Sequence, residues 1–268
     1  AGSLRTPASF CGVFAFKPTV GGINRGGSFD TISQSATSTF AATLEETWEI
    51  ARAIVARVGG DSGRPGVSGP MEAPAAKKPK RVAMLETEGW EGAEPSAKMA
   101  LSDARGMLVD ANIEVIDRES HAGVAAIEAA IAGGVALSGG LNSWEGRWPL
   151  NTYARDMDRT KLSPEAQDRL EFAEAMTNED YQGLLRKRQQ IRDIYKGLKA
   201  DADVCVTLSA PGPAPVGHNW TGDAVFAVPS SILGTPSFSL PVLQCDGLPL
   251  GLQIMGYAEQ DAAAFAAA

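Results

Sequence analysis

The amino-terminal stretch AGSLRTPAS places Ser3 directly behind two small residues, Ala1 and Gly2. A serine hydroxyl acts as a nucleophile when a base takes its proton and nearby donors hold the oxyanion that forms. Backbone N–H groups in a turn of small residues can converge on one oxygen. The pair Gly-Ser is common in loops, so these residues alone indicate a candidate nucleophile and not yet a site.

Histidine is scarce, which limits the choice of base. The chain has two, and a Ser-His-Asp triad would have to use one of them. His121 precedes a helical pattern and is expected to be exposed, whereas His218 lies in a loop after a strand. We expect surface or supporting roles for both, and the other known solution is a lysine base acting through a second serine.

The three cysteines, Cys11, Cys205 and Cys245, are far apart and form no C-x-x-C pair. This spacing argues against a disulfide framework and a zinc knuckle, so no metal and no cofactor is expected. Cys11 and Cys205 lie in apolar runs, which predicts buried side chains in a reducing, cytoplasmic setting.

Composition sets the broad class. The chain has 268 residues, is 44% hydrophobic and 21% charged, and carries a formal net charge of −8. The acidic excess argues against a nucleic-acid partner. No apolar run is long enough to span a membrane. A globular domain large enough to build a core is expected.

The elements that would position Ser3 can be predicted in outline. Residues 12–17 read as a buried strand, followed by a glycine-rich loop. Thr43 and Glu46 form a capping-box pattern at the start of a helix that Gly59 and Gly60 would end. The expected buried face of this helix is made by Trp48, Ala51, Ile54, Val55 and Val58.

The loop 59–80 leads into a second part of the chain. Strand 81–86, helix 95–112 and strand 113–117 make a βαβ unit with parallel strands. Residues 122–199 read as helical, with caps expected at Ser163 and Asn178. Further strands are expected at 203–209, 236–242 and 250–257. The fold class is therefore α/β, with a mixed central β-sheet flanked by helices.

The opening stretch closely resembles the amidase signature family, whose members carry a Gly-Gly-Ser-hydrophobic-Arg-x-Pro-Ala segment followed by Cys-Gly and Lys-Pro-Thr. The matching residues are Gly2, Ser3, Leu4, Arg5, Pro7, Ala8, Cys11, Gly12, Lys17, Pro18 and Thr19. Ala1 and Ala15 stand where glycine is usual, and Gln34, Ser35 and Ser38 depart from a Ser-Leu-Asp-Thr-x-Gly segment. These departures indicate a subgroup with a differently lined pocket.

Later segments extend the resemblance to about residue 257. They read DADVCVTLSAPGPAP, ILGTPSFSLPV and GLPLGLQIMG. The resemblance implies that the chain is the C-terminal portion of a single amidase domain, incomplete at its N-terminus and beginning at the nucleophile motif.

The resemblance also implies roles. Ser3 would be the nucleophile, and the N–H groups of Ala1 and Gly2 would form the oxyanion hole. The bridging serine and the lysine of a Ser-Ser-Lys triad would lie upstream. Lys17 would be structural, and Arg5 would anchor the loop through an ion pair rather than contact substrate.

The segment APGPAPVGHNWTGDAVFAVPSSILG is expected to line the substrate pocket. His218, Trp220 and Phe226 are its candidate substrate-binding residues, and the equally weighted alternative is a loop that only packs on the sheet.

Three functions stay open at this point. The first is a hydrolase of small-molecule amides, without nucleic-acid or membrane partners and compatible with a homodimer. The second is the amide-transferring subunit of a tRNA-dependent amidotransferase. The third is a non-catalytic remnant. The motif is shared by the first two, and the SQSATS segment together with the acidic charge favours the hydrolase.

Overall fold

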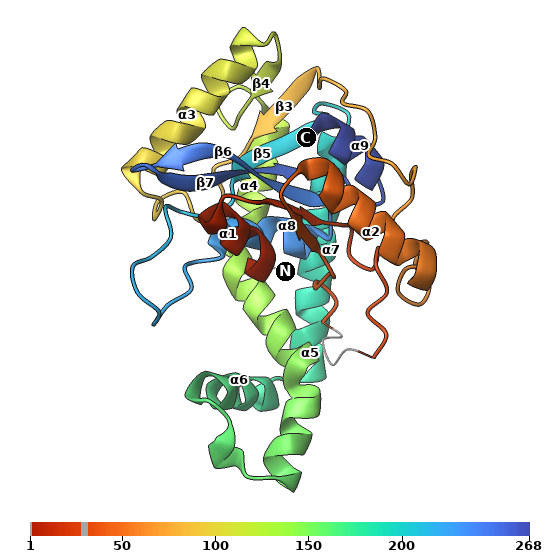
Figure 1. Ribbon diagram of the computed structural model, residues 1–268. Helices are drawn as coiled ribbons and strands as arrows, with labels where there is room; N and C mark the ends of the chain where they lie inside the picture. The colour runs from red at the N-terminus through yellow and green to blue at the C-terminus, as the bar shows by residue number, and fades with distance from the viewer. Residues whose placement is uncertain (1, 28–31) are drawn as a thin grey trace.

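The computed structural model describes residues 2–27 and 32–268, apart from the side chain of Pro149. In this part of the chain a seven-stranded sheet has the order β2-β1-β6-β7-β5-β3-β4 (Figure 1). The strands are β1 (Phe14–Lys17), β2 (Thr39–Ala41), β3 (Arg81–Met84), β4 (Glu114–Ile116), β5 (Val204–Leu208), β6 (Ser237–Cys245) and β7 (Leu248–Met255). Each expected strand is present.

The sheet is mixed, as the sequence predicts. β3 pairs in parallel with both β4 and β5, which confirms the βαβ unit. The remaining neighbours are antiparallel. β6 and β7 form a hairpin around Asp246-Gly247, where both residues have positive φ, of 53° and 79°. This is the backbone that an Asp-Gly pair favours in two-residue hairpin loops.

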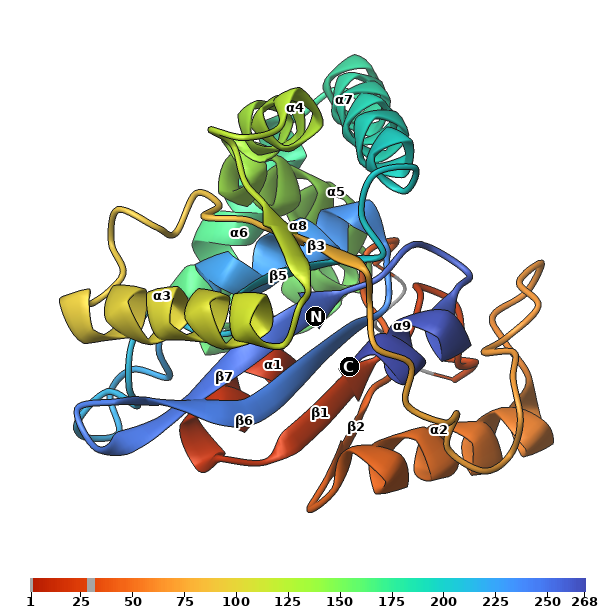
Figure 2. The same cartoon turned by 90° about the horizontal axis from the view of Figure 1, so that it is seen from above.

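Helices cover both faces of the sheet (Figure 2). The helices are α1 (Gly2–Cys11), α2 (Leu44–Val58), α3 (Pro95–Asp110), α4 (Ala122–Ile131), α5 (Gly134–Asp156), α6 (Pro164–Ala175), α7 (Asn178–Leu198), α8 (Val228–Leu233) and α9 (Asp261–Ala267), with 3-10 turns η1 (Arg159–Lys161) and η2 (Val225–Ala227). No helix or strand occurs between 59 and 80, where a loop is expected. The expected class, a mixed sheet flanked by helices, is confirmed.

Side chains along each strand alternate between the two faces of the sheet, which divides the core into two layers. Phe16, Val206 and Ile254 point to the face covered by α2, α3 and α9. Cys205 and Met255, their neighbours along β5 and β7, point to the face covered by α4, α5, α7 and α8. This is the period of two that a sheet buried on both faces requires.

The start and end of α2 are as predicted. The Thr43 side chain accepts a hydrogen bond from Glu46 N, and the Glu46 carboxylate accepts one from the backbone N–H of Thr43. Gly59 is the C-cap. Trp48 and Ala51 are fully buried, but Val58, the last residue of the helix, is 50% exposed.

Two other expectations are wrong. The N-cap of α7 is Thr177, which forms a capping box with Asp180, and Asn178 is already helical. Cys11, the last residue of α1, is exposed, whereas Cys205 is buried as predicted.

The segment that departs from the family pattern binds to α5. Gln34 Nε2 donates to Ser138 Oγ at 2.8 Å and to Asn142 Oδ1 at 2.7 Å. The neighbouring Ser33 donates from its N–H and hydroxyl to Glu145. These polar residues therefore fasten the glycine-rich loop to the upper part of α5, while the lower part of α5 and α6 project away from the sheet (Figure 1).

Candidate active site

Ser3 lies in the first turn of α1, and not in an irregular turn as its small neighbours suggest. The helix ends at Gly12, which has φ +63°, and Val13 N–H returns to the Ala8 carbonyl oxygen at 3.1 Å. A bond of this kind across a glycine with positive φ is a common helix ending. Ser3 is exposed, and its hydroxyl makes no hydrogen bond to any described residue.

The change from turn to helix keeps the donors that an oxyanion needs. The first N–H groups of a helix have no partner within the helix, and the helix dipole favours negative charge there. Gly2 and Ser3 are the first residues of α1. Ala1, the other expected oxyanion-hole residue, lies outside the described residues.

Arg5 fastens α1 to the segment that follows β5, but without an ion pair. The side chain is fully buried, and its Nη2 donates to the Ala227 carbonyl oxygen at 2.6 Å and to Ser231 Oγ at 3.3 Å. Burial lowers the pKa of Arg5 to about 9. Among the described residues no carboxylate contacts the guanidinium, and Nε and Nη1 have no partner. The expected ion pair is wrong, because a carbonyl oxygen takes the place of the acid.

Hydroxyl groups that the sequence analysis did not single out lie beneath α1. Ser209, directly after β5, and Ser239 of β6 lie on either side of β7 and are joined by a 2.8 Å hydrogen bond between their hydroxyls. Ser9 of α1 accepts from Gly251 N at 2.7 Å. A Cβ atom on Gly251 would lie 2.4 Å from Ser239 Oγ and 2.9 Å from Ser209 Cβ, so glycine at this point leaves room for the serine pair. A run of buried serines at alternate strand positions is the signal that could have predicted this layer.

Lys17 is buried and committed to the backbone. Its Nζ donates to the carbonyl oxygens of Pro18 at 2.8 Å and Thr235 at 2.6 Å. Burial lowers its pKa well below the ordinary value, and the charges of Arg5 and Arg192 act in the same direction. These contacts give Lys17 the structural role that the resemblance implies.

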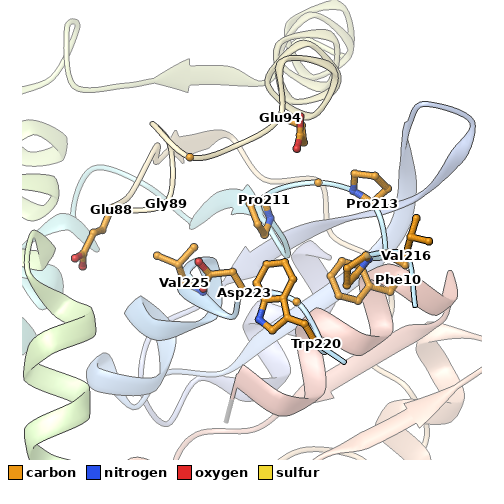
Figure 3. A pocket seen from close by; sticks show the side chains of 15 residues that line it. Phe10, Glu88, Gly89, Glu94, Pro211, Pro213, Val216, Trp220, Asp223 and Val225 are labelled. Atoms are coloured by element: carbon orange, nitrogen blue, oxygen red, sulfur yellow. The ribbon is translucent and has the colours of Figure 1, made fainter. Parts of the chain in front are cut away.

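A cavity of about 450 Å³ opens beside α1, at the carboxyl ends of β3 and β5 (Figure 3). Its apolar wall consists of Phe10 from α1, Trp220 and the proline-rich loop 211–216. Its lining includes the carboxylates of Glu88, Glu94 and Asp223 and no lysine, arginine or histidine. The cavity therefore favours an apolar ligand with a neutral or positively charged group.

Two of these carboxylates are held by backbone N–H groups. Glu88 Oε2 accepts from Val135 N at 3.0 Å, at the start of α5. Asp223 Oδ1 accepts from Val225 N at 2.9 Å, at the start of η2. Glu94 makes no side-chain cap at the start of α3 and is exposed, so its carboxylate is not held by the backbone in the way those of Glu88 and Asp223 are.

The structure brings one of the three expected substrate-binding residues to this cavity. Trp220 lines it and is 62% exposed. His218 is exposed on the same loop but is not part of the lining, and Phe226 is fully buried in the core, where it packs beneath Gly89 of the cavity rim. Phe226 is placed there because η2 turns its ring toward the sheet. Substrate contact by any of the three stays a prediction.

The segment 222–225 connects the cavity to Ser3. Gly222 and Val225 line the cavity. Ala224, between them, lies directly against Gly2, since a Cβ atom added to Gly2 would come within 2.7 Å of the Ala224 Cβ. The nucleophile candidate is thus one residue from a contact with the cavity wall.

No group of three or more metal-ligating side chains occurs in the described part of the chain. Among the same residues, no single helix is long and apolar enough to cross a membrane. The bent pair Ala122–Ile131 and Gly134–Trp148 passes that test only by combined length and composition.

Comparison with known proteins decides the family. Residues 1–265 match the family model Amidase. The chain belongs to the amidase family. The resemblance of the opening motif to the amidase signature enzymes is thereby confirmed.

Curated relatives of this amidase-family chain belong to amidotransferases. The A subunit of glutamyl-tRNA(Gln) amidotransferase from Clostridium botulinum (strain Eklund 17B / Type B) is 26% identical over 97% of this chain and 59% of the relative. The protein of the same name from Rhodospirillum rubrum is 27% identical over 95% of this chain and 56% of the relative. The chain thus spans less than two thirds of the length of these relatives.

Solved structures share the fold. A crystal structure of amidase has a TM-score of 0.81 at 19% identity, covering 99% of this chain and 59% of the other. The 6-aminohexanoate cyclic dimer hydrolase complexed with substrate has a TM-score of 0.73 at 18% identity, covering 99% and 61%. At these identities the likeness shows the fold alone.

Proposed function

We propose that this chain carries the nucleophile and the substrate pocket of an amide-bond hydrolase, with Ser3 as the residue that is acylated. The observation that supports this most is the position of Ser3. It is exposed at the start of α1, and Gly2 beside it touches the segment that lines the 450 Å³ cavity. A substrate carbonyl at the mouth of that cavity could reach both the hydroxyl and the free N–H groups of the first helical turn.

The proposed reaction has two steps. Ser3 Oγ attacks the carbonyl carbon of a small-molecule amide, its proton passes to the departing amine, and the C–N bond breaks to leave an acyl-serine. Water then hydrolyses this ester and regenerates Ser3. The N–H groups of Ala1 and Gly2 are the proposed oxyanion donors, and removing one such donor costs roughly 3–4 kcal/mol in the barrier.

The proposed base is a lysine that acts through a bridging serine, as in amidase signature enzymes. Lys17 does not fit this role, because its Nζ is buried and bonded to two carbonyl oxygens. In those enzymes the lysine and bridging serine precede the nucleophile. We therefore propose that the 268-residue chain alone hydrolyses amides slowly, since members of a catalytic unit lose most of their effect when one is missing.

The amide substrate is proposed to occupy the cavity, against Trp220. His218 stands on the same loop, and Phe226 supports the rim from within the core. Contact of these two with substrate, the single amidase domain, a homodimer and a cytoplasmic location remain predictions.

A fluorophosphonate probe tests the nucleophile without requiring turnover. The chain is incubated with the probe at pH 7 and at pH 9, where hydroxide can replace an absent base, and digested with trypsin. We expect the label on the peptide of residues 1–5, no label in Ser3→Ala, and normal labelling in Ser102→Ala, an exposed serine on α3. Label elsewhere, or none at either pH, would contradict the assignment and favour a non-catalytic remnant.

The second candidate is the amide-transferring subunit of an amidotransferase. It is supported by the curated relatives, which are named as the A subunit of glutamyl-tRNA(Gln) amidotransferase. The two candidates differ in the fate of the ammonia, which a hydrolase releases and a transferase passes to an acceptor. Free ammonia formed in proportion to free acid, without any partner protein, would support the hydrolase.

A further inference from the structure

A second cavity, of about 400 Å³, lies along α7, and we refer to it as the α7 cavity. Its walls are α7, the turn 233–235 between α8 and β6, and the turn 257–260 between β7 and α9. Cys205 at the start of β5 pairs with Met255 at the end of β7. The α7 cavity is therefore at the opposite end of the sheet from the cavity beside Ser3, which lies where β5 ends.

The charges around the α7 cavity are mainly positive. Its lining contains Arg64, Arg192, Lys196 and Lys199, and the acids among the described lining residues are Asp193 and Glu259. Over the described lining this is an excess of two positive charges, in a chain whose formal net charge is −8. Each acid already has a partner, since Asp193 accepts from Gln189 at 2.8 Å and Glu259 pairs with Arg64 at 3.6 Å.

The spacing of the cations follows from the helix. Gln189, Arg192, Lys196 and the C-cap residue Lys199 are separated by three, four and three residues, which places them on one stripe that runs to the end of α7. The buried side of the helix, with Ile191, Tyr195 and Leu198, is fixed against the core. The stripe is therefore held in position along the cavity.

Arg192 is the best-positioned group. Its Nε donates to the Ile232 carbonyl oxygen at 2.8 Å, which fixes the plane of the guanidinium. No described residue accepts a hydrogen bond from either Nη atom. Gly234 makes room for this plane, because a Cβ atom there would lie 3.0 Å from Nη2. Burial and the charges of Arg188 and Arg64 lower the pKa of Arg192 to about 10, so an anion beside it would be favoured.

We propose that the α7 cavity binds a phosphate-type anion, either inorganic phosphate or a small phosphate monoester, with Arg192 as the central ligand and Lys196 and Lys199 as supporting charges. A guanidinium fork with two free Nη atoms matches two oxygens of one phosphate. The two lysine ammonium groups on the same stripe suit the second negative charge of a phosphate, which a monocarboxylate lacks. The site is independent of the chemistry proposed for Ser3.

Isothermal titration calorimetry at constant ionic strength tests the proposal on the 268-residue chain. Inorganic phosphate, glycerol 3-phosphate and acetate are titrated separately. We expect saturable binding of at least one of the two phosphates, at least ten-fold tighter than acetate. The order of affinity of the two phosphates distinguishes the free ion from a monoester as ligand. Equal binding of all three anions, or no saturation, would overturn the proposal.

Variants assign the binding to the cavity. Arg192→Gln should weaken phosphate at least ten-fold, and the double variant Lys196→Gln, Lys199→Gln several-fold. Arg186→Gln is the matched control, because Arg186 is exposed on the same helix outside the cavity lining. An equal loss in Arg186→Gln and Arg192→Gln would show a general charge effect and refute the site.

The folding of the variants is tested in a separate measurement. Arg192→Gln removes the bond to Ile232, so its thermal unfolding is measured alongside binding. The two lysines are exposed, and α7 contacts the core through other residues, so the double variant should unfold like the unaltered chain. A double variant that folds normally and binds phosphate with unchanged affinity would also refute the site.

Discussion

Gly2 lies so close to Ala224 that a Cβ atom on Gly2 would come within 2.7 Å of the Ala224 Cβ. The added Cβ on Gly2 and the Cβ of Ala224 are both bonded directly to the backbone, so no side-chain rotation can relieve the contact. Gly2→Ala should push α1 away from η2 and destabilise the chain by about 1–3 kcal/mol, the usual cost of overpacking. Denaturant unfolding measures the change.

The control for this prediction is Gly106→Ala, in the interior of α3, where nothing lies within 4 Å of the added Cβ. That substitution should stabilise the chain by up to about 1 kcal/mol through helix propensity. If both variants shift stability in the same direction by the same amount, the close contact at Gly2 has no energetic consequence.

The cap of α7 gives a second prediction. Thr177 and Asp180 bond reciprocally at the helix start, with the Asp180 carboxylate 2.8 Å from Thr177 N. Thr177→Ala should therefore cost about 1 kcal/mol of stability, and Asn178→Ala next to nothing. Thermal or urea unfolding of the two variants decides between the positions, and a larger loss in Asn178→Ala would contradict the observed cap.

The two caps also show where sequence reasoning stops. Thr43 and Glu46 are spaced as a capping box, and the structure confirms the box. At α7 the residues Thr177, Asn178 and Asp180 all favour caps, but only Thr177 has the capping-box spacing to Asp180. Neighbouring residues of equal propensity are distinguished only by such spacing and by the length of helix that packing selects.

Six of the seven strands could be predicted because they are apolar and bounded by clear turns. The edge strand β2, Thr39–Ala41, could not, because it is short and ends a segment that reads as a glycine-rich loop. The partners of Arg5 could not, because a buried guanidinium can be satisfied by a carboxylate or by a carbonyl oxygen such as that of Ala227, and only the path of the chain decides. The different positions of Phe226 and Trp220 could not be predicted either. Both are aromatic residues of one segment, yet Phe226 of η2 is buried in the core, whereas Trp220, which precedes η2, lines the cavity.

A third prediction concerns ligand charge in the cavity beside Ser3, and it rests on the proposed function. Its lining has carboxylates and no cation, and Trp220 can bind a cation on its face. We expect 4-(aminomethyl)benzamide to protect Ser3 from the fluorophosphonate at a concentration several-fold lower than 4-carboxybenzamide does. Neutral 4-methylbenzamide should lie between them.

The carboxylate responsible can be assigned with a matched pair of variants. Glu94→Gln should reduce the difference between the two charged amides, because Glu94 lines the cavity without a cap of its own. Glu91→Gln, at an exposed position outside the lining, should leave it unchanged. Equal protection by both amides in the unaltered chain would refute the electrostatic preference.

Acid stability provides the fourth prediction. The Ser120 hydroxyl and Arg105 both donate to Asp117, and these bonds lower the pKa of Asp117 from 3.8 to about 2. A carboxylate whose pKa is lower in the folded state stabilises that state at pH values above its pKa in the unfolded chain. This contribution is lost as the pH falls through its pKa in the folded state. Asp117 is only 14% exposed, so the loss between pH 4 and pH 2 should be about 1–2 kcal/mol.

Urea unfolding as a function of pH should show a shallower decline over this range in Asp117→Asn than in the unaltered chain. Asp103→Asn, at an exposed position on α3, should decline like the unaltered chain, and parallel curves for Asp117→Asn and Asp103→Asn would contradict the role of the Ser120 and Arg105 bonds.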